Sequence, residues 1–317
     1  MDKLSGLKIA ICQMNVIPGR PDLNAEYMIN KIYLAVKNGN DVIVFPEMCV
    51  PGYMIGDRFE DAAFIADVQI FNKKICDAAK EAGVVVIFGT VIIDRVMKKG
   101  EDGRQRKYNG ALIAGSGAID YVIKTLQPNY RIFDDDRYFY SGRKAFDGHP
   151  KFMPIEIGAK IGKIKIGVIL CEDMWHEDYP LNPTEELVKN GAEIVFNLSA
   201  SPWTWQKNRK RHKVVKGLLS RNPVPFVYVN NTGIQDTGKN IVIFEGSSTV
   251  YGKSGEIIFE IPPYESGVRD FVFDGNEKTV IAAERGDTKE LYEALKCAIG
   301  EFIKTFPPHM RKVVVGL

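Results

Sequence analysis

Three residues whose side chains could act together on a carboxamide each follow a short apolar run. Glu47 comes after DVIVF in the segment FPEM, Lys124 ends the run AIDYVIK, and Cys171 comes after IKIGVIL in the segment LCEDMW. Side chains at the carboxyl ends of buried strands in α/β folds tend to surround a common site. We therefore take these three as the candidate site.

The chemistry of carboxamide cleavage needs these residue types. A thiol attacks such a carbon well only as thiolate, so Cys171 needs a base. A carboxylate such as Glu47 can take the thiol proton and later give it to the leaving ammonia. The oxyanion needs positive charge or donors, which the Lys124 ammonium and the backbone N–H of Glu172 could provide. Taken singly, each residue also has a plainer interpretation, as a solvated loop acid, an edge charge or a small core cysteine.

The elements that must position these residues can be read from hydrophobic periodicity. Apolar runs indicate strands at 8–14, 41–45, 84–89, 108–114, 118–124, 163–170, 193–198, 225–230, 247–251, 256–260 and 270–273. Helical spacing indicates helices at 22–38, 67–82, 183–190, 205–220 and 287–306. A loop of about 35 residues follows Lys124, which is long enough to be suspected of function.

Composition narrows the class of protein. The 317 residues are 45% hydrophobic and 26% charged, an ordinary globular balance, and the net charge of +2 favours neither nucleic acid nor a membrane as partner. Five scattered cysteines without a CxxC pair indicate reduced thiols in a cytoplasmic protein. The first apolar run is too short for a signal peptide, no segment has the roughly 20 apolar residues of a transmembrane helix, and four scattered histidines make a zinc site improbable.

The segments around the three residues carry a resemblance. FPEMCVPGY, KTLQPNYRIFDDDRYF and ILCEDMWHED, in that order, resemble the signature segments of the nitrilase superfamily of carbon-nitrogen hydrolases. KTLQPNY, CEDMW and NLSASPW are more narrowly similar to the glutaminase domain of glutamine-dependent NAD synthetases, over residues 7 to 275. The resemblance implies an α/β fold built as a four-layer α-β-β-α sandwich. It implies Glu47 as general base, Lys124 as transition-state stabiliser, Cys171 as nucleophile, and no metal or organic cofactor for the amidase step.

The resemblance also implies substrate contacts. Tyr53 and Tyr130, each six residues after a member of the triad, match aromatic positions that line a glutamine pocket. Ser199 and Ser201 match a segment that meets the α-amino end of the substrate. The remaining expected contacts flank the nucleophile or begin the next helix: Glu172, Trp175 and Lys207.

Two assignments stay open at this point. Either Lys207 or Arg211 could meet the substrate's α-carboxylate. Relatives in the resembled family tend to carry a glutamate shortly after the lysine, whereas this chain has FDDDRYF there, so Asp135 would have to serve or the role lies elsewhere. His176 lies five residues after Cys171 and offers a Cys-His alternative, although a histidine in a polar loop is more often a surface residue.

The C-terminal segment extends the narrower resemblance. KVVVGL resembles the strand that leads into a Gly-rich ATP-pyrophosphate loop in these synthetases. We therefore expect residues 1–275 to form the glutaminase domain, and 276–317 to be the linker, helix and first strand of a truncated synthetase domain. ATP and Mg²⁺ are then expected only for that missing domain, beyond residue 317 or supplied in trans, and we expect a homo-oligomer.

The expected function is a glutamine amidohydrolase working through a cysteine thioester. Its ammonia would serve the ATP-dependent amidation of nicotinic acid adenine dinucleotide to NAD. One alternative is a free-standing amidase or carbamoyl hydrolase acting on another small amide. Another is a non-catalytic binding module with a relict site, against which the intact triad argues. The basic run KNRKRHK, at 207–213, fits a solvated helix face better than a nucleic-acid patch.

Overall fold

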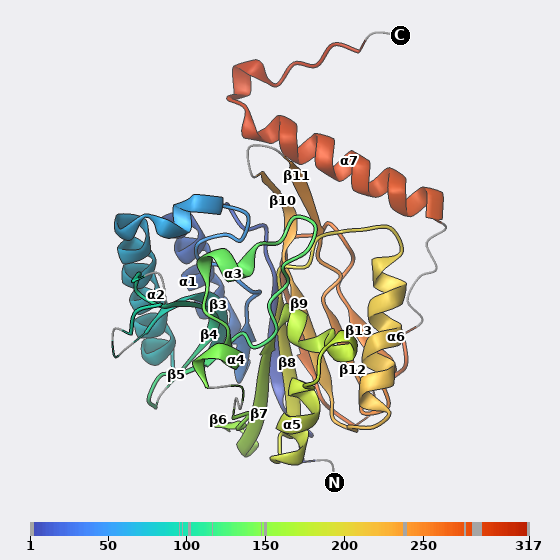
Figure 1. The fold of residues 1–317 in the computed structure, drawn as a ribbon. Coiled ribbons are helices and arrows are strands. Elements are labelled where there is room, and N and C mark those ends of the chain that lie inside the picture. The colour runs from blue at the N-terminus through green and yellow to red at the C-terminus, as the bar shows by residue number, and fades with distance from the viewer. Residues whose placement is uncertain are drawn as a thin grey trace.

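Two six-stranded β-sheets form the centre of the computed structural model (Figure 1). The structure describes residues 3–94, 96, 98–100, 103–115, 117–146, 148, 151–236, 240–275, 277–280 and 287–315. Helices cover the outer face of each sheet, and the inner faces pack on each other (Figure 1).

The first sheet carries two of the candidate site residues near the ends of its strands. Its strands are β1 (Lys8–Gln13), β2 (Val42–Val44), β3 (Val85–Ile93), β4 (Lys107–Ala114), β5 (Asp120–Ile123) and β14 (Gly267–Val272). They are arranged in the order β14-β1-β2-β3-β4-β5. The pairs β1–β2 and β2–β3 are parallel and the other pairs are antiparallel.

The second sheet carries Cys171 at the end of one strand. Its strands are β6 (Ile155–Ala159), β7 (Gly162–Leu170), β8 (Ile194–Ser199), β9 (Phe226–Asn230), β12 (Thr249–Tyr251) and β13 (Ile257–Glu260). They are arranged in the order β13-β12-β9-β8-β7-β6, with β7–β8 and β8–β9 parallel.

Five longer helices and several short ones complete the fold. The longer helices are α1 (Pro21–Lys37), α2 (Ala62–Ala82), α5 (Pro183–Lys189), α6 (Lys207–Leu219) and α7 (Asp287–Thr305). The short ones are α3 (Asp135–Tyr138), α4 (Gly142–Ala145) and the 3-10 turns η1 (Gly56–Glu60), η2 (Cys171–Met174), η3 (His176–Asp178) and η4 (Pro308–Met310). No helix within the described ranges is both long and apolar enough to cross a membrane.

Side-chain alternation along the strands builds the layers. In β1, Ile9 and Ile11 lie in the core between the sheets, whereas Ala10 and Cys12 face the core under α1 and α2. A third core packs α5 and α6 on the outer face of the second sheet. Successive side chains of a strand point to opposite faces, so a strand buried on both sides reads as a continuous apolar run. The predicted four-layer α-β-β-α sandwich is confirmed.

Several predicted boundaries were wrong. Helix α2 begins at Ala62 and not at 67, because the Asp61 carboxylate caps it by accepting hydrogen bonds from Ala63 N at 2.9 Å and Phe64 N at 3.4 Å. The long loop after Lys124 contains α3, α4 and β6. The hairpin β10 (Thr232–Asp236) and β11 (Ile241–Glu245) was missed altogether.

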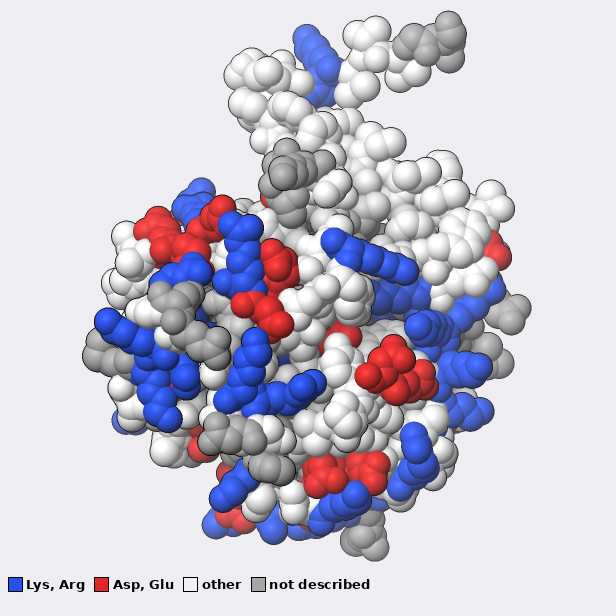
Figure 2. Space-filling model, in the orientation of Figure 1, with Lys and Arg blue, Asp and Glu red and all other residues white. Residues whose placement is uncertain are grey.

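Helix α7 lies against the β10–β11 hairpin (Figure 1). Ala294 is buried there, whereas Leu295 and Ile299 are 51% and 60% exposed, and the visible surface over α7 is mostly uncharged (Figure 2). The predicted strand at 312–317 does not form over its described residues, where Val313–Val315 are exposed and unpaired with any described strand. Residues 316 and 317 lie outside the described ranges. The boundary at 275 stays a prediction.

Candidate active site

The two sheets bring the three candidate residues together. Glu47 follows β2 and Lys124 follows β5 in the first sheet, whereas Cys171 follows β7 in the second. Their residues are 0%, 1% and 8% exposed, respectively. The site therefore lies in the interior, where strand ends from both sheets meet.

Lys124 forms two buried ion pairs. Its Nζ lies 2.8 Å from Glu47 Oε1 and 2.9 Å from Asp135 Oδ2. Burial opposes the ammonium charge, but Asp135 and Glu47 outweigh it and raise the pKa of Lys124 well above its usual value. The lysine is thus held as a cation. Asp135, the residue that the sequence analysis named for the acid after the lysine, lies directly beside the ammonium.

Two neutral donors orient the Glu47 carboxylate. Asn109 Nδ2 donates to Oε1 at 2.8 Å, and the backbone N–H of Ala200 donates to Oε2 at 2.8 Å. A Cβ at Gly89 would lie 2.4 Å from Glu47 Cα, so only glycine lets β3 pass this close. Sequence reasoning missed Asn109 and Ala200. Asn109, a polar residue inside an apolar strand, is a signal that could have been used, whereas the Ala200 amide gives none.

The nucleophile candidate sits on a strained turn. Cys171 has φ +36°, a left-handed backbone that costs a non-glycine residue about 1–2 kcal/mol. Burial raises the pKa of its thiol above the usual value and Glu47 raises it further, while Lys124 and Lys207 lower it. The resting thiol is therefore neutral and depends on a base for activation.

Tyrosine hydroxyls surround the charged groups. Tyr53 is buried and donates to Asp135 Oδ1 at 2.5 Å. Tyr130 and Tyr179 both donate to the Glu172 carboxylate, at 2.9 Å to Oε2 and 3.0 Å to Oε1. Tyr130 is 48% exposed and so lies on the solvent side of the site. Tyr179 was not singled out in the sequence.

The remaining predicted contacts lie around this centre. Ser199 is fully buried, and its Oγ donates to Asn197 Oδ1. The backbone N–H of Ser201 donates to Asn230 Oδ1 at 2.8 Å, which fixes the position of Ser201. Trp175 packs against the core under α5 and α6, with Lys210 Nζ 5.5 Å from its ring centroid. The two serines flank Ala200, whose backbone N–H binds the Glu47 carboxylate.

Lys207 and Arg211, one turn apart on α6, have different surroundings. Lys207 Nζ donates to Pro202 O at 2.9 Å, and burial lowers its pKa although Cys171, Glu245 and Glu172 act to raise it. Arg211 is 2% exposed and donates to Ser247 O at 3.0 Å. Its guanidinium also stacks 4.2 Å from the ring centroid of Tyr228. Arg211 thus anchors α6 to the second sheet, so that of these two α6 cations Lys207 is the one whose charge acts on the thiol.

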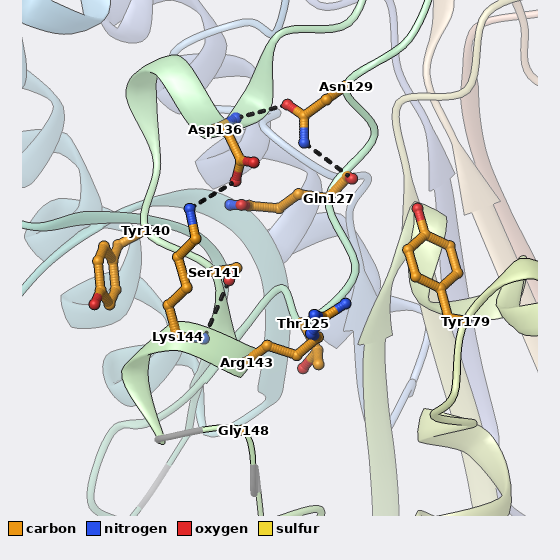
Figure 3. Close-up of a pocket in the computed structure, with 10 residues that line it drawn as sticks. All are labelled: Thr125, Gln127, Asn129, Asp136, Tyr140, Ser141, Arg143, Lys144, Gly148 and Tyr179. Atoms are coloured by element: carbon orange, nitrogen blue, oxygen red, sulfur yellow. Dashed lines mark hydrogen bonds and ion pairs between the residues drawn. The ribbon is translucent and has the colours of Figure 1, made fainter.

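A pocket of about 570 Å³ opens beside the site (Figure 3). In Figure 3 Tyr179 stands on one side, and the segment from Thr125 to Gly148 lines the other. Thr125 directly follows Lys124, and Tyr179 binds Glu172, so both walls continue into the site. The Lys144–Asp136 pair at 3.6 Å lies on its rim.

His176 belongs to a different charge environment. Burial and Arg221 lower its pKa, and Glu177 and Glu185 oppose them, whereas the charges acting on the Cys171 thiol are Glu47, Lys124, Lys207 and Glu172. Within the described ranges, no group of three or more His, Cys, Asp or Glu side chains is arranged to hold a metal ion.

Comparison with known proteins gives consistent matches. The family model described as carbon-nitrogen hydrolase matches residues 8–274. A glutamine-dependent NAD(+) synthetase of Acinetobacter baylyi is 30% identical over an alignment of 311 residues, and the alignment covers 95% of this chain and 51% of that protein. A second one, from Synechocystis, is 27% identical over an alignment of 308 residues, and the alignment covers 93% of this chain and 52% of that protein. The chain thus spans about half the length of these relatives.

Solved structures show the same pattern. A glutamine-dependent NAD+ synthetase from Acinetobacter baumannii in complex with ADP superposes with a TM-score of 0.76 at 27% identity, covering 95% of this chain and 52% of that one. A Nesterenkonia amidase of the nitrilase superfamily gives a TM-score of 0.67 at 16% identity, covering 92% of this chain and 94% of that one. The second likeness shows the fold.

Proposed function

The chain belongs to the carbon-nitrogen hydrolase family, and on that premise we propose that it hydrolyses the side-chain carboxamide of glutamine. The observation that carries the proposal is the buried Lys124–Glu47 pair beside the neutral Cys171 thiol. A carboxylate base, a fixed ammonium and a nucleophile then share one interior site.

The proposed reaction has two halves. Glu47 takes the thiol proton as Cys171 Sγ attacks the carboxamide carbon, and the Lys124 ammonium with the Glu172 N–H stabilises the resulting oxyanion. Protonated Glu47 then gives its proton to the leaving nitrogen, so that ammonia departs and a thioester remains. Water attacks the thioester while Glu47 accepts its proton, and Glu47 returns that proton to Cys171 Sγ as the C–S bond breaks, so that glutamate and the free thiol are released.

The substrate end of the site is proposed to recognise the amino-acid head. Lys207 is the cation in position for the α-carboxylate, since its charge already acts on Cys171 and Glu172. Glu172 and the Ser199–Ser201 segment suit the α-ammonium, and Tyr130 lines the solvent side. Lys207→Met should therefore raise KM for glutamine far more than it lowers kcat.

The released ammonia is proposed to serve a synthetase. The matched NAD(+) synthetases are about twice as long as this chain, and the matching region is the hydrolase-like half. We propose that a synthetase part, in the same polypeptide or in trans, uses ATP and Mg²⁺ to amidate nicotinic acid adenine dinucleotide. Ammonia release by the present chain should then be independent of ATP.

The test is ammonia release from glutamine and from a panel of small aliphatic amides and carbamoyl compounds. We expect glutamine to be the best substrate, with activity abolished in Cys171→Ala and nearly so in Cys171→Ser, because a hydroxyl beside a carboxylate base stays protonated. Cys297→Ala, at a half-buried cysteine on α7, is the matched control and should keep full activity. A higher kcat/KM for another amide would instead support the free-standing amidase. A folded wild-type chain that hydrolyses none of them would support the relict module.

A further inference from the structure

We propose that Asp173 is a positioning residue that fixes the Cys171 turn against the residues following Lys124. The proposal rests on the roles proposed above for Cys171 and Lys124, but not on the identity of the amide. Asp173 lies two residues after the nucleophile in η2 and is 2% exposed. It touches neither Glu47 nor the thiol in any contact described, so the triad chemistry does not account for it.

The Asp173 carboxylate joins backbone from both sheets. Its Oδ1 accepts from the N–H of Thr125 at 3.1 Å and of Leu126 at 2.7 Å. Its Oδ2 accepts from the N–H of Leu170 at 3.1 Å. Thr125 and Leu126 directly follow Lys124, and Leu170 directly precedes Cys171. One side chain therefore spans the gap between the two catalytic loops.

Two of these donors lie beyond the end of a strand, and the third lies beyond the end of one of the two ladders of its strand. β5 ends at Ile123, so Thr125 and Leu126 lie past the last ladder pair of the first sheet. β6 pairs with β7 only as far as Ile166, so Leu170 has no partner on the β6 side, although it pairs with Leu198 of β8 on the other side. Buried N–H groups without acceptors are strongly unfavourable, and the carboxylate satisfies all three.

Both catalytic loops need such a restraint. β5 has 4 residues and lies at the edge of its sheet, so the sheet alone holds Lys124 weakly. Cys171 has a left-handed backbone, and such conformations persist only where the surroundings over-determine them. Since the sulfur and the ammonium must meet the same carbonyl group, the distance between the loops sets the rate.

An amide at this position reproduces the shape but not the acceptors. Asp173→Asn keeps one oxygen and presents an NH₂ group to a backbone donor, so the two loops can no longer be held on one side chain. A misplacement of about 1 Å can cost roughly 10²-fold in rate. We therefore expect kcat to fall about 10²-fold while KM changes less than about threefold, because the substrate contacts lie elsewhere.

The test compares Asp173→Asn with Met174→Ala on the same turn. Met174 is fully buried in the core under α5 and α6, so its truncation lowers stability without touching the three bonds. Steady-state kinetics, thermal unfolding and the rate at which iodoacetamide labels Cys171, followed by peptide mass spectrometry, are measured for both. Asp173→Ser, which keeps one small acceptor, is measured alongside, and it replaces Asp173→Asn in the comparison if Asp173→Asn does not fold.

Support requires that the Asp173 variants lose kcat and Cys171 labelling selectively, while Met174→Ala loses stability and keeps kcat. The proposal is overturned if an Asp173 variant keeps kcat within about threefold, or if Met174→Ala loses as much kcat at equal stability loss. If wild-type protein releases ammonia from another amide but not from glutamine, the glutaminase proposal fails, and the same comparison of kcat and Cys171 labelling is made with that amide.

Discussion

Cys171 is a neutral thiol set among four charged side chains. Glu47 and Glu172 raise the pKa of the thiol, and Lys124 and Lys207 lower it, with burial as the largest effect. In the proposed reaction, the charge needed for nucleophilic attack is created when Glu47 removes the proton. This arrangement protects the cysteine from adventitious electrophiles while leaving it able to react with a bound amide.

The raised pKa predicts how Cys171 alkylation depends on pH. Because the thiol is un-ionised at neutral pH, the rate of iodoacetamide labelling should rise about tenfold per pH unit from 7 to 9, without a plateau. Glu47→Gln removes a charge that raises the pKa, so this variant should be labelled faster than wild type although it no longer hydrolyses glutamine. Both the pH dependence and the effect of Glu47→Gln are measured by quenching the labelling reaction at intervals and analysing the Cys171 peptide by mass spectrometry. A plateau below pH 8 would mean that the thiolate is already present in the resting site.

Lys124 is predicted to matter for stability as well as rate. Lys124→Met leaves the buried Glu47 and Asp135 carboxylates without their cation, which should cost about 3–5 kcal/mol of unfolding free energy. Loss of the oxyanion charge should lower kcat by roughly 10²–10³. Lys163→Met, which removes an exposed ion pair to Glu156, is the control and should change stability little, because water screens such a pair. Denaturant unfolding and ammonia release are the measurements, and equal stability loss in both variants would contradict this account.

At the scale of elements, the β10–β11 hairpin supports the loop that carries Glu47. Gln235 on β10 is buried, and its Oε1 accepts from the N–H groups of Tyr53 and Met54 at 2.9 and 3.0 Å. Tyr53 in turn holds Asp135. The hairpin therefore acts on the site through the Tyr53 segment.

Gln235→Ala should show this coupling. It leaves two buried N–H groups without an acceptor, at about 1–3 kcal/mol each, and should raise KM by releasing Tyr53. Ile241→Ala, at a position 41% exposed on the same hairpin, should change little. Urea unfolding and steady-state kinetics are the measurements. An unchanged KM at reduced stability would show that the hairpin contributes to stability and not to substrate binding.

The sequence predicted those elements whose burial is evident from their own residues. Strands buried on both faces, such as β1 and β8, appear as continuous apolar runs and were found. β10 reads TGIQD, a composition typical of turns, and is a strand only because β11 pairs with it. The same limit applies to the site. Glu47 is oriented by Asn109 and Ala200, which lie 62 and 153 residues away, so no local pattern could assign them.

At the scale of the whole molecule, α7 is attached to the sandwich by one buried side chain and several polar contacts, which include Arg209 and Gln206 to Asp287 at 3.1 and 3.2 Å. Ala294 is buried, Trp203 Nε1 donates to Glu290 at 3.1 Å, and Asn15 Nδ2 donates to Glu301 at 3.0 Å. Of the apolar stripe of the helix, Leu295 and Ile299 remain exposed, and most of the other side chains are only partly buried. The sandwich cores are formed by residues before 275.

Deleting residues 287–317 should therefore leave the fold and the site intact. The lost contacts amount to about 1–2 kcal/mol, which corresponds to a decrease in Tm of roughly 2–8 °C for a domain of this size. The glutaminase rate should stay within about twofold of wild type. Thermal unfolding and ammonia release test this, and a misfolded product would place the domain boundary later than residue 275.

At position 171 the left-handed backbone favours glycine for stability, whereas the proposed reaction requires a cysteine. Glycine accepts this conformation without the clash of a Cβ, so Cys171→Gly should be about 1 kcal/mol more stable than Cys171→Ala in denaturant unfolding, although both are inactive. Selection for stability alone would replace the cysteine. A cysteine on so unfavourable a turn fits the proposed nucleophilic role, and mutational scans that score only abundance should rank its replacement by glycine or alanine as harmless.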